Sequence, residues 1–227
     1  MPATKRKAVV LLSGGLDSAT TLAVARDRGY EIYAMSFRYG QTHGVELDCA
    51  RWQATTASAQ EHIVVDIDLG QIGGSQLVSD SQRPAVEDSP IPATYVPARN
   101  TIFLSFALAW AEVLEAEAIF IGVNAVDYSG YPDCRPEFIH AFERVAKVAT
   151  RIAVEDRTQV RIEAPLIHKT KGEIIALGNE LGVDYSQTHS CYFPDEQGRS
   201  CGTCDSCKLR LKGFREVGQE DPRSYQS

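Results

Sequence analysis

The residues best suited to chemistry in this sequence are the six from Ser13 to Ser18, Ser-Gly-Gly-Leu-Asp-Ser. A short apolar segment, 8–12, precedes them, and 19–28 has the pattern of a helix that ends at Gly29. A glycine turn between a strand and a helix lets backbone N–H groups approach an anion, and the helix dipole adds attraction. The pattern predicts a nucleotide phosphate site made by Leu12, Ser13, Gly14, Gly15, Leu16, Asp17, Ser18 and Ala19.

Asp17 is the unusual member of this loop. A carboxylate repels a phosphate unless a cation such as Mg²⁺ bridges the two groups. The common P-loop, Gly-x4-Gly-Lys-Ser/Thr, does not occur in the sequence. The alternative is a plain tight turn in which Asp17 or Ser18 caps a helix. The segment resembles the signature of the PP-loop ATP pyrophosphatases. These enzymes transfer AMP to a carboxylate or carbonyl oxygen of the substrate, and a nitrogen or sulfur nucleophile then displaces AMP.

A second chemical signal is a group of four cysteines, Cys191-x9-Cys201-x2-Cys204-x2-Cys207. Four thiolates on short loops are what a closed tetrahedral zinc site needs, and we expect Zn²⁺ there. An iron–sulfur cluster is the rival interpretation, because Cys-x2-Cys-x2-Cys also occurs in such proteins. Disulfides are disfavoured in a cytosolic chain.

The composition limits what surrounds these groups. The chain has 227 residues, enough for one sizeable α/β domain, and a formal net charge of −7. That charge disfavours nucleic acid as a partner, and no apolar stretch has the length of a membrane span. We therefore expect a cytoplasmic protein with no nucleic-acid or membrane partner.

Strand-like and helix-like segments alternate along the sequence. The apolar patterns predict strands over 8–12, 31–37, 63–67, 118–123 and 160–166, and helices over 19–28, 42–60, 99–114, 138–152 and 170–181. This alternation predicts an α/β fold with a doubly wound parallel five-stranded sheet of the adenine nucleotide hydrolase-like, PP-loop type. We expect residues 1–186 to form the ATP-binding domain and 187–227 to form a zinc-binding segment.

Ligands of such sheets bind beyond the carboxyl ends of the strands. Ser13 and Arg38 leave strands there, so Arg38 is expected to contact adenine or phosphate, although a surface role is as plausible. Residues 69–98 lack periodicity and are expected to form a lid or binding loop. The helix that follows begins at Arg99 and Asn100, which should face the phosphate loop.

The last predicted helix opens with a capping box, Thr170-Lys-Gly-Glu173. Lys169 and Lys171 stand at its start and are expected to face phosphate. We expect Asp17, Ser13 and Lys169 to carry the catalytic chemistry.

The segment after the fourth strand combines polar, aromatic and glycine residues, which favours a ligand pocket over a connector. Together with 13–18, Tyr39-Gly-Gln41, Val96-Pro-Ala-Arg-Asn100 and the four cysteines, residues 127–138 (Asp-Tyr-Ser-Gly-Tyr-Pro-Asp-Cys-Arg-Pro-Glu-Phe) resemble the 7-cyano-7-deazaguanine synthases of the queuosine pathway. The likeness spans nearly the whole chain. Ala98 stands where such families often have glycine.

The resemblance implies a homodimeric, zinc-containing ligase that forms carbon–nitrogen bonds. Its substrates would be 7-carboxy-7-deazaguanine, ammonia and ATP, and its product the 7-cyano base. A carboxylate accepts hydrogen bonds from the guanine edge, and a guanidinium holds the substrate's carboxylate. The expected substrate residues are Arg99, Asn100, Asn124, Asp127, Tyr128, Tyr131, Asp133 and Arg135.

In that pocket Asp133 or Asp127 would read the base, Arg135 or Arg99 would hold the carboxyl group, and the tyrosines would stack. The alternative is that these charges pair with one another and stiffen the loop. Two other functions stay open. A tRNA thiolase would use Cys49 or Cys134 to carry sulfur, and a zinc-binding module would need no catalysis.

Overall fold

The computed structural model describes residues 5–40, 44–78, 91–124 and 130–226. Within them the chain forms a parallel sheet of β1 (Lys7–Leu11), β2 (Glu31–Arg38), β3 (Glu61–Asp66), β4 (Ala118–Phe120) and β5 (Arg161–Glu163). The strand order is β3-β2-β1-β4-β5, and every paired register is parallel. The expected doubly wound α/β fold is therefore confirmed.

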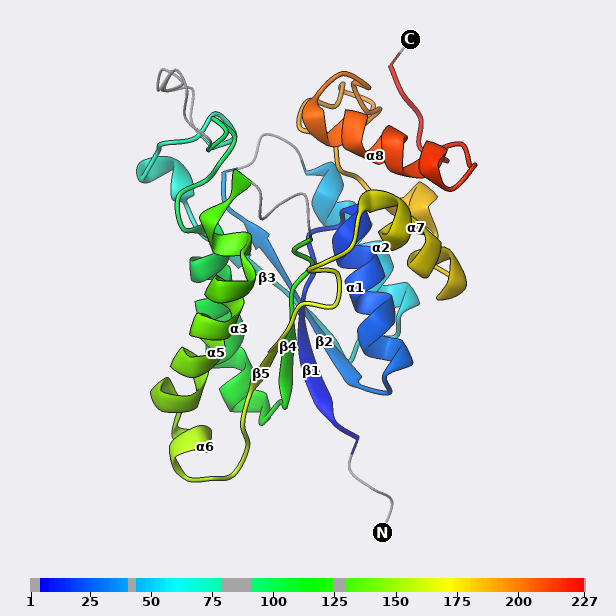
Figure 1. Cartoon of the computed structure of the whole chain (residues 1–227). Coiled ribbons are helices and arrows are strands. Elements are labelled where there is room, and N and C mark those ends of the chain that lie inside the picture. The colour runs from blue at the N-terminus through cyan, green and yellow to red at the C-terminus, as the bar shows by residue number, and fades with distance from the viewer. Residues whose placement is uncertain (1–4, 41–43, 79–90, 125–129, 227) are drawn as a thin grey trace.

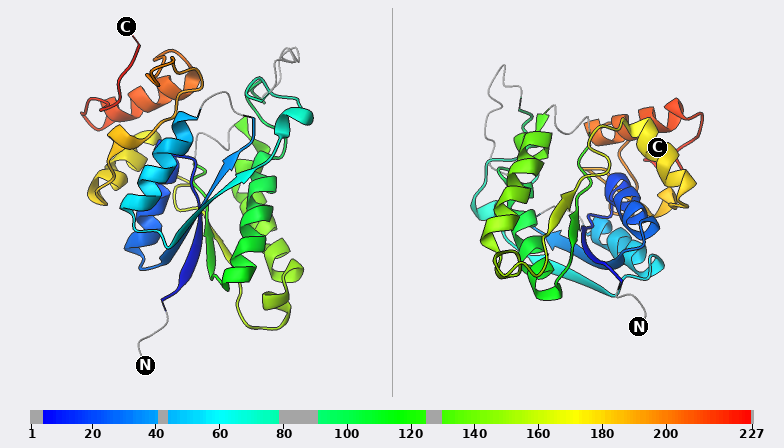
Figure 2. Two further views of the ribbon diagram at one scale, coloured as in Figure 1. Left: turned by 180° about the vertical axis from the view of Figure 1, so that it is seen from behind. Right: turned by 60° about the horizontal axis from the view of Figure 1, so that its bottom comes forward.

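Helices cover both faces of the sheet (Figures 1 and 2). One face carries α3 (Arg99–Leu114), α5 (Pro136–Ala149) and α6 (Arg151–Val154). The other carries α1 (Leu16–Asp27), α2 (Val45–Thr56) and α7 (Lys171–Glu180), and α8 (Asp205–Glu216) packs on α7 beyond the strand ends. Short 3₁₀ turns η1 (Leu69–Gln71), η2 (Pro132–Cys134) and η3 (Tyr185–Gln187) lie in the connections.

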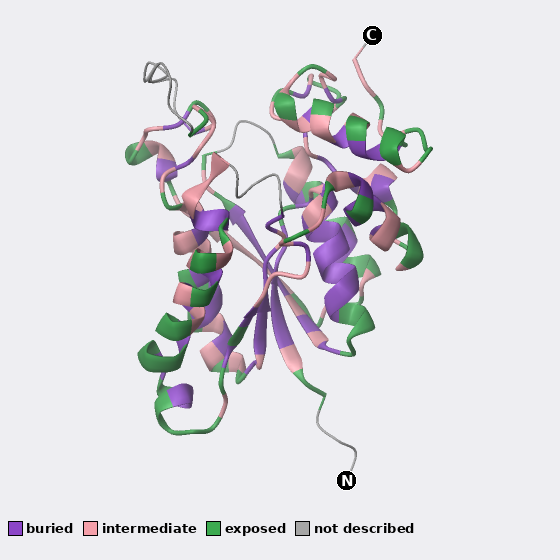
Figure 3. Ribbon diagram, viewed as in Figure 1, coloured by how far each residue is buried: buried purple, intermediate pink, exposed green. Residues whose placement is uncertain are grey.

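The central strand β1 anchors two separate cores because successive side chains of a strand point to opposite faces. Val9 and Leu11 pack in one apolar cluster with Leu104 of α3, whereas Ala8 and Val10 pack in another with residues of α1 and α2. Figure 3 shows the central strands largely buried and the outward faces of the helices exposed. The start of α1 thus follows a central, buried strand.

Several element boundaries differ by a few residues from the sequence-based expectation, and two of the differences need a physical explanation. Helix α1 begins at Leu16 rather than at residue 19, because Gly15 is extended (φ −79°, ψ 171°) and acts as the N-cap. Asp17 and Ser18 therefore lie in the first helical turn and are not caps. The helix expected over 138–152 is broken at Thr150, whose φ of −111° and ψ of 142° are extended, so α5 and α6 are separate.

The sheet order creates a crevice between β1 and β4, which is where ligands bind in this architecture. A Cβ built on Gly122, just after β4, would lie 3.2 Å from the backbone of both Asp17 and Ser18. The segment after β4 thus packs directly against the start of α1.

The C-terminal segment lies over the same crevice. Its helix α8 packs on α7 so closely that a Cβ on Gly213 would lie 2.8 Å from the Cβ of Lys171. The division of the chain at residue 187 stays a prediction.

Candidate functional site

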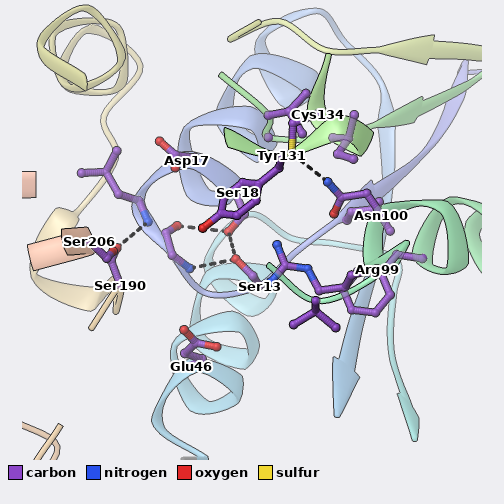
Figure 4. Close-up of a pocket in the computed structure, with 18 of the residues that line it drawn as sticks. Ser13, Asp17, Ser18, Glu46, Arg99, Asn100, Tyr131, Cys134, Ser190 and Ser206 are labelled. Carbon is purple, nitrogen blue, oxygen red and sulfur yellow. Dashed lines mark hydrogen bonds between the residues drawn. The ribbon is translucent and has the colours of Figure 1, made fainter. Parts of the chain in front are cut away.

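A cavity of about 290 Å³ opens at the carboxyl ends of β1 and β4 (Figure 4). It is near the lower end of the range of small-molecule sites. Its walls come from segments far apart in the sequence: Ser13–Ser18, α2, the residues before α3, the residues after β4, and 189–210. Polar, charged and aromatic side chains on these walls include Ser13, Asp17, Ser18, Glu46, Tyr95, Arg99, Asn100, Tyr131, Asp133, Cys134, Lys171 and Ser190.

The loop backbone is fixed by close packing at Gly14. Its φ is +87°, and a Cβ there would collide with the backbone oxygen of Glu46. Only glycine fits this position. The Gly14 carbonyl accepts hydrogen bonds from the His189 N–H (2.9 Å) and from Gln53 Nε2 (3.0 Å). The loop is therefore held between α2 and the C-terminal segment.

The two serines of the loop form one hydrogen-bonded set. Ser13 Oγ lies 3.1 Å from Ser18 Oγ, and Ser18 Oγ donates to the Gly15 carbonyl at 3.0 Å. The Gly15 N–H donates to Ser13 Oγ at 3.3 Å. First-turn N–H groups of a helix lack intrahelical acceptors, so the start of α1 offers donors to an anion.

Asp17 has one oxygen engaged and one without a partner. Oδ2 accepts a 2.6 Å hydrogen bond from Lys171 Nζ, whereas Oδ1 is buried and has no hydrogen-bond partner within the described part of the chain. An orphaned carboxylate oxygen suits Mg²⁺, which prefers oxygen ligands and is usually held by one or two carboxylates together with phosphates. The residues present thus fit the expected cation.

Lys171, rather than Lys169, is the lysine that lines this cavity. It is the first residue of α7, and the predicted capping box is present, with the Thr170 side chain accepting from the Glu173 N–H. The capping box fixes where α7 begins and so which lysine reaches Asp17.

Sequence reasoning missed Glu46, in the first turn of α2. Its half-buried carboxyl group lines the cavity, and burial raises its pKa from 4.5 to about 7 although the charge of Arg99 lowers it. Nothing local in the sequence distinguishes Glu46 from Asp48, which is exposed and pairs with Arg51 at 2.7 Å. The packing of α2 on Gly14 turns Glu46 inward.

Arg99 places a guanidinium in the wall of the cavity. Burial lowers its pKa, but the neighbouring Tyr39, Cys134 and Asp133 outweigh burial and raise the pKa above its ordinary value. Its guanidinium carbon lies 5.9 Å from the centre of the Tyr39 ring, within reach of a cation–π contact. Ala98, before it, has φ +53°. Glycine adopts this left-handed conformation more readily than alanine does.

Asp133 stabilises the start of α3 from the segment after β4. Its Oδ2 accepts from the Asn100 N–H at 2.8 Å, and Asn100 Nδ2 donates to the Asp133 carbonyl and to Cys134 Sγ, each at 3.1 Å. This network is buried, so one oxygen of Asp133 has a structural role.

Two aromatic rings form a flat wall of the cavity. The rings of Tyr95 and Tyr131 lie 5.9 Å apart at 21°, and Thr94 Oγ1 is 3.0 Å from Tyr131 Oη. Such a wall provides a stacking surface for a planar ligand.

Some predicted site residues do not line the cavity. Arg38 is exposed and pairs with Asp66 at 2.5 Å, and Arg135 is the exposed residue before α5. Asn124 is fully buried next to the lining residue Val123 but does not itself line the cavity. Asp127 and Tyr128 lie outside the described residues. The cavity thus brings together the loop, Arg99, Asn100, Tyr131 and Asp133.

The four cysteines converge as predicted. The sulfur atoms of Cys191, Cys201, Cys204 and Cys207 all lie within 4.8 Å of one another, and none is in a disulfide. Backbone N–H groups donate to these sulfurs, for example Cys201 N to Cys191 Sγ at 3.2 Å. Four sulfur donors with N–H support fit a tetrahedral Zn²⁺ site. Cys191 also lines the cavity, so the cluster borders it.

A buried ion pair within the C-terminal segment involves Arg210, which also lines the cavity. Arg210 Nε donates to Asp221 Oδ2 at 2.6 Å, and both side chains are at most 4% exposed. Arg210 also donates to Thr188 Oγ1 (2.7 Å) and to the Tyr185 carbonyl (2.9 Å). These bonds hold the residues just before His189 in place.

Fold and loop together define an α/β protein of the PP-loop type. Among solved structures, an NMN synthetase from Francisella tularensis is similar at a TM-score of 0.52 and 16% identity, covering 96% of this chain and 79% of its own. A predicted subunit of tRNA methyltransferase from Methanocaldococcus jannaschii is similar at a TM-score of 0.51 and 15% identity, covering 98% and 93%. These likenesses concern the fold alone.

Sequence comparison gives a narrower result. Residues 7–218 match the family described as queuosine biosynthesis protein QueC, and the chain belongs to that family. It is 62% identical over 222 residues to a 7-cyano-7-deazaguanine synthase of Syntrophotalea carbinolica, covering 97% of this chain and 96% of that protein. It is 63% identical over 222 residues to the synthase of Geobacter sulfurreducens, covering 97% and 93%. The resemblance inferred from the motifs is confirmed.

A search of the described helices finds none that is long and apolar enough to span a membrane.

Proposed function

We propose that this protein catalyses the ATP-dependent conversion of 7-carboxy-7-deazaguanine and ammonia into 7-cyano-7-deazaguanine. The observation that carries the proposal is the cavity that joins an ATP-type loop to the cation Arg99 and the Tyr95–Tyr131 wall. The names of the relatives support the product.

The loop and Lys171 would hold the phosphates of ATP. Donors at the start of α1 and the hydroxyls of Ser13 and Ser18 would contact the β- and γ-phosphates. Asp17 would hold Mg²⁺, which neutralises charge on the departing pyrophosphate. Lys171, already bound to Asp17, would turn towards phosphate when that cation is present.

The base would lie against Tyr95 and Tyr131. Arg99 would hold the carboxylate by paired hydrogen bonds and turn it towards the α-phosphate of ATP. We choose Arg99 over Arg135 because, of these two, Arg99 alone lines the cavity. The free hydrogen-bonding capacity of Asp133 would read the guanine edge.

The chemistry would proceed in two adenylation cycles. The carboxylate oxygen attacks the α-phosphate, pyrophosphate leaves, and ammonia displaces AMP to form an amide. The amide oxygen is adenylated in turn, and loss of AMP and of both N–H protons leaves the nitrile. Both cycles need the same loop, which fits a protein with one such cavity among its described residues.

The thiolase alternative receives no support from the cysteines outside the cluster. Cys49 and Cys134 are both buried, and Asn100 donates a hydrogen bond to Cys134. The expected homodimer and cytoplasmic location stay predictions.

Mass spectrometry of products tests the proposal. The protein is incubated with 7-carboxy-7-deazaguanine, ATP and ammonium, and reactions lacking ATP or ammonium serve as controls. We expect the amide and then the nitrile, with AMP and pyrophosphate. A second reaction with 7-deazaguanine, which lacks the carboxyl group, should consume no ATP. Formation of ADP instead of AMP would contradict the adenylation route.

A further inference from the structure

We propose that Glu46 is the proton acceptor for the nitrogen chemistry in this cavity, receiving the N–H proton that is lost as the amide and then the nitrile form. The inference rests on the proposed function. It concerns a residue that the motif 13–18 does not contain.

The position of Glu46 is set by backbone packing. The close fit of Gly14 against the Glu46 carbonyl ties the first turn of α2 to the phosphate loop. In Figure 4 the Glu46 side chain rises from α2 on the side of the pocket where Ser13 and Arg99 also lie. The carboxyl group is therefore next to the place where an acyl group held by Arg99 would meet the α-phosphate.

Of the acidic side chains in the cavity, Glu46 is the one whose carboxylate is available to accept a proton. Three acidic side chains line the cavity in the described part of the chain: Asp17, Glu46 and Asp133. Asp17 is paired with Lys171, and Asp133 accepts from the Asn100 N–H. Within the same residues, the carboxyl group of Glu46 has no hydrogen bond or ion pair. A carboxylate without a partner in a cavity is costly and suggests a ligand group that it serves.

The groups around Glu46 bring its pKa into the range that a proton acceptor needs. Arg99 from α3 is the charged neighbour that favours its ionised form. Tyr39, after β2, and Cys49, on α2, are the nearby titratable groups, and Glu46 contributes to raising the pKa of each. Burial dominates, and the resulting pKa of about 7 is close to that of an effective general base at neutral pH.

The proposed proton transfers balance in both cycles. In the first, the ammonia lone pair bonds to the acyl carbon, the C–O bond to AMP breaks, AMP leaves with that electron pair, and the excess N–H proton passes to Glu46. In the second, the adenylated amide carries two N–H protons. One passes to Glu46 and leaves the neutral imidate. The other passes to Glu46 while the C–O bond to AMP breaks, AMP leaves with that electron pair and the C≡N bond forms. Glu46 releases each proton to water between steps.

The test separates adenylation from nitrogen addition in Glu46→Gln. Exchange of labelled pyrophosphate into ATP, dependent on 7-carboxy-7-deazaguanine, reports adenylation and should stay within about threefold of the unsubstituted protein. Amide and nitrile formation should fall by about 100-fold or more, the contribution typical of a general base. Asp48→Asn removes a carboxylate from the same helical turn and should leave both rates unchanged.

The pH profile gives an independent readout. In the unsubstituted protein kcat/KM for ammonium should fall below about pH 7 as Glu46 is protonated, and the residual rate of Glu46→Gln should lack that limb. Glu46→Asp, with a shorter carboxylate, should keep the limb at a reduced rate.

Equal loss of exchange and product in Glu46→Gln would overturn the proposal, because it would place Glu46 in adenylation or binding. An unchanged product rate would overturn it too. If the unsubstituted protein shows no exchange with the carboxylated base, the proposed function itself fails, and this inference fails with it.

Discussion

Replacing Glu46 by Gln should stabilise the protein at alkaline pH. The pKa of this carboxyl group rises from 4.5 to about 7 on folding. The folded state therefore binds the proton more tightly than the unfolded state, and stability falls as pH rises from 4.5 to 7. At about 1.4 kcal/mol for each tenfold change in proton affinity, the ionised carboxylate costs up to about 3 kcal/mol above pH 7.

The neutral amide avoids that cost. Because the carboxylate borders an open cavity, screening reduces the effect, and we expect a gain of about 1–3 kcal/mol near pH 8. For a chain of this size the gain corresponds to a rise in Tm of roughly 3–10 °C. Near pH 5.5 the folded state already holds the proton, and less than about half of the stability gain should remain.

Thermal unfolding followed by circular dichroism at the two pH values measures this difference. Asp48→Asn serves as the control, since its carboxylate is exposed on the same helix and its loss should change stability by no more than about 0.5 kcal/mol. A Tm gain that is independent of pH, or a loss of stability at pH 8, would refute the reasoning that ionised Glu46 is destabilising.

Three further perturbations address other parts of the site. Asp17→Asn should abolish ATP-derived pyrophosphate while leaving the melting curve nearly unchanged, because it removes the proposed cation ligand; persistent pyrophosphate release would contradict that role. Elemental analysis should find one zinc per chain, and Cys204→Ser should lose the metal and lower Tm, whereas iron in place of zinc would contradict the assignment. Asp221→Ala should cost about 3–5 kcal/mol in urea unfolding because it leaves Arg210 charged and buried, while Asp205→Asn on the exposed side of α8 should cost less than about 0.5 kcal/mol.

The fold and the two chemical centres could be predicted because their signals are local. The apolar strand 8–12, the glycine pair and the following helix are contiguous, and the spacing of the cysteines limits how far their sulfurs can separate. Alternation of strands with helices then leaves few topologies, since parallel crossovers are right-handed. Contiguous patterns of this kind need no knowledge of tertiary packing.

Which polar residues line the cavity depends on tertiary contacts that the sequence does not show. Glu46 faces the cavity only because α2 packs on Gly14. Lys171 reaches Asp17 because the capping box begins α7 at that residue, although Lys169 is just as close in sequence. Arg38 ends a strand at the correct edge of the sheet, but Asp66 on the neighbouring strand pairs with it at the surface. Each outcome is decided by a partner distant in sequence.

The contact between Gly14 and His189 also affects when the phosphate loop is completed during protein synthesis. About 170 residues separate the phosphate loop from the segment that completes its wall. A ribosome adds about 5–20 residues each second, so the loop waits roughly 10–30 s before His189 has been synthesised. Until then the Gly14 carbonyl lacks one of its two donors. Nucleotide capture should therefore be among the last properties that a newly made chain acquires, well after the β1–β2 pair has formed.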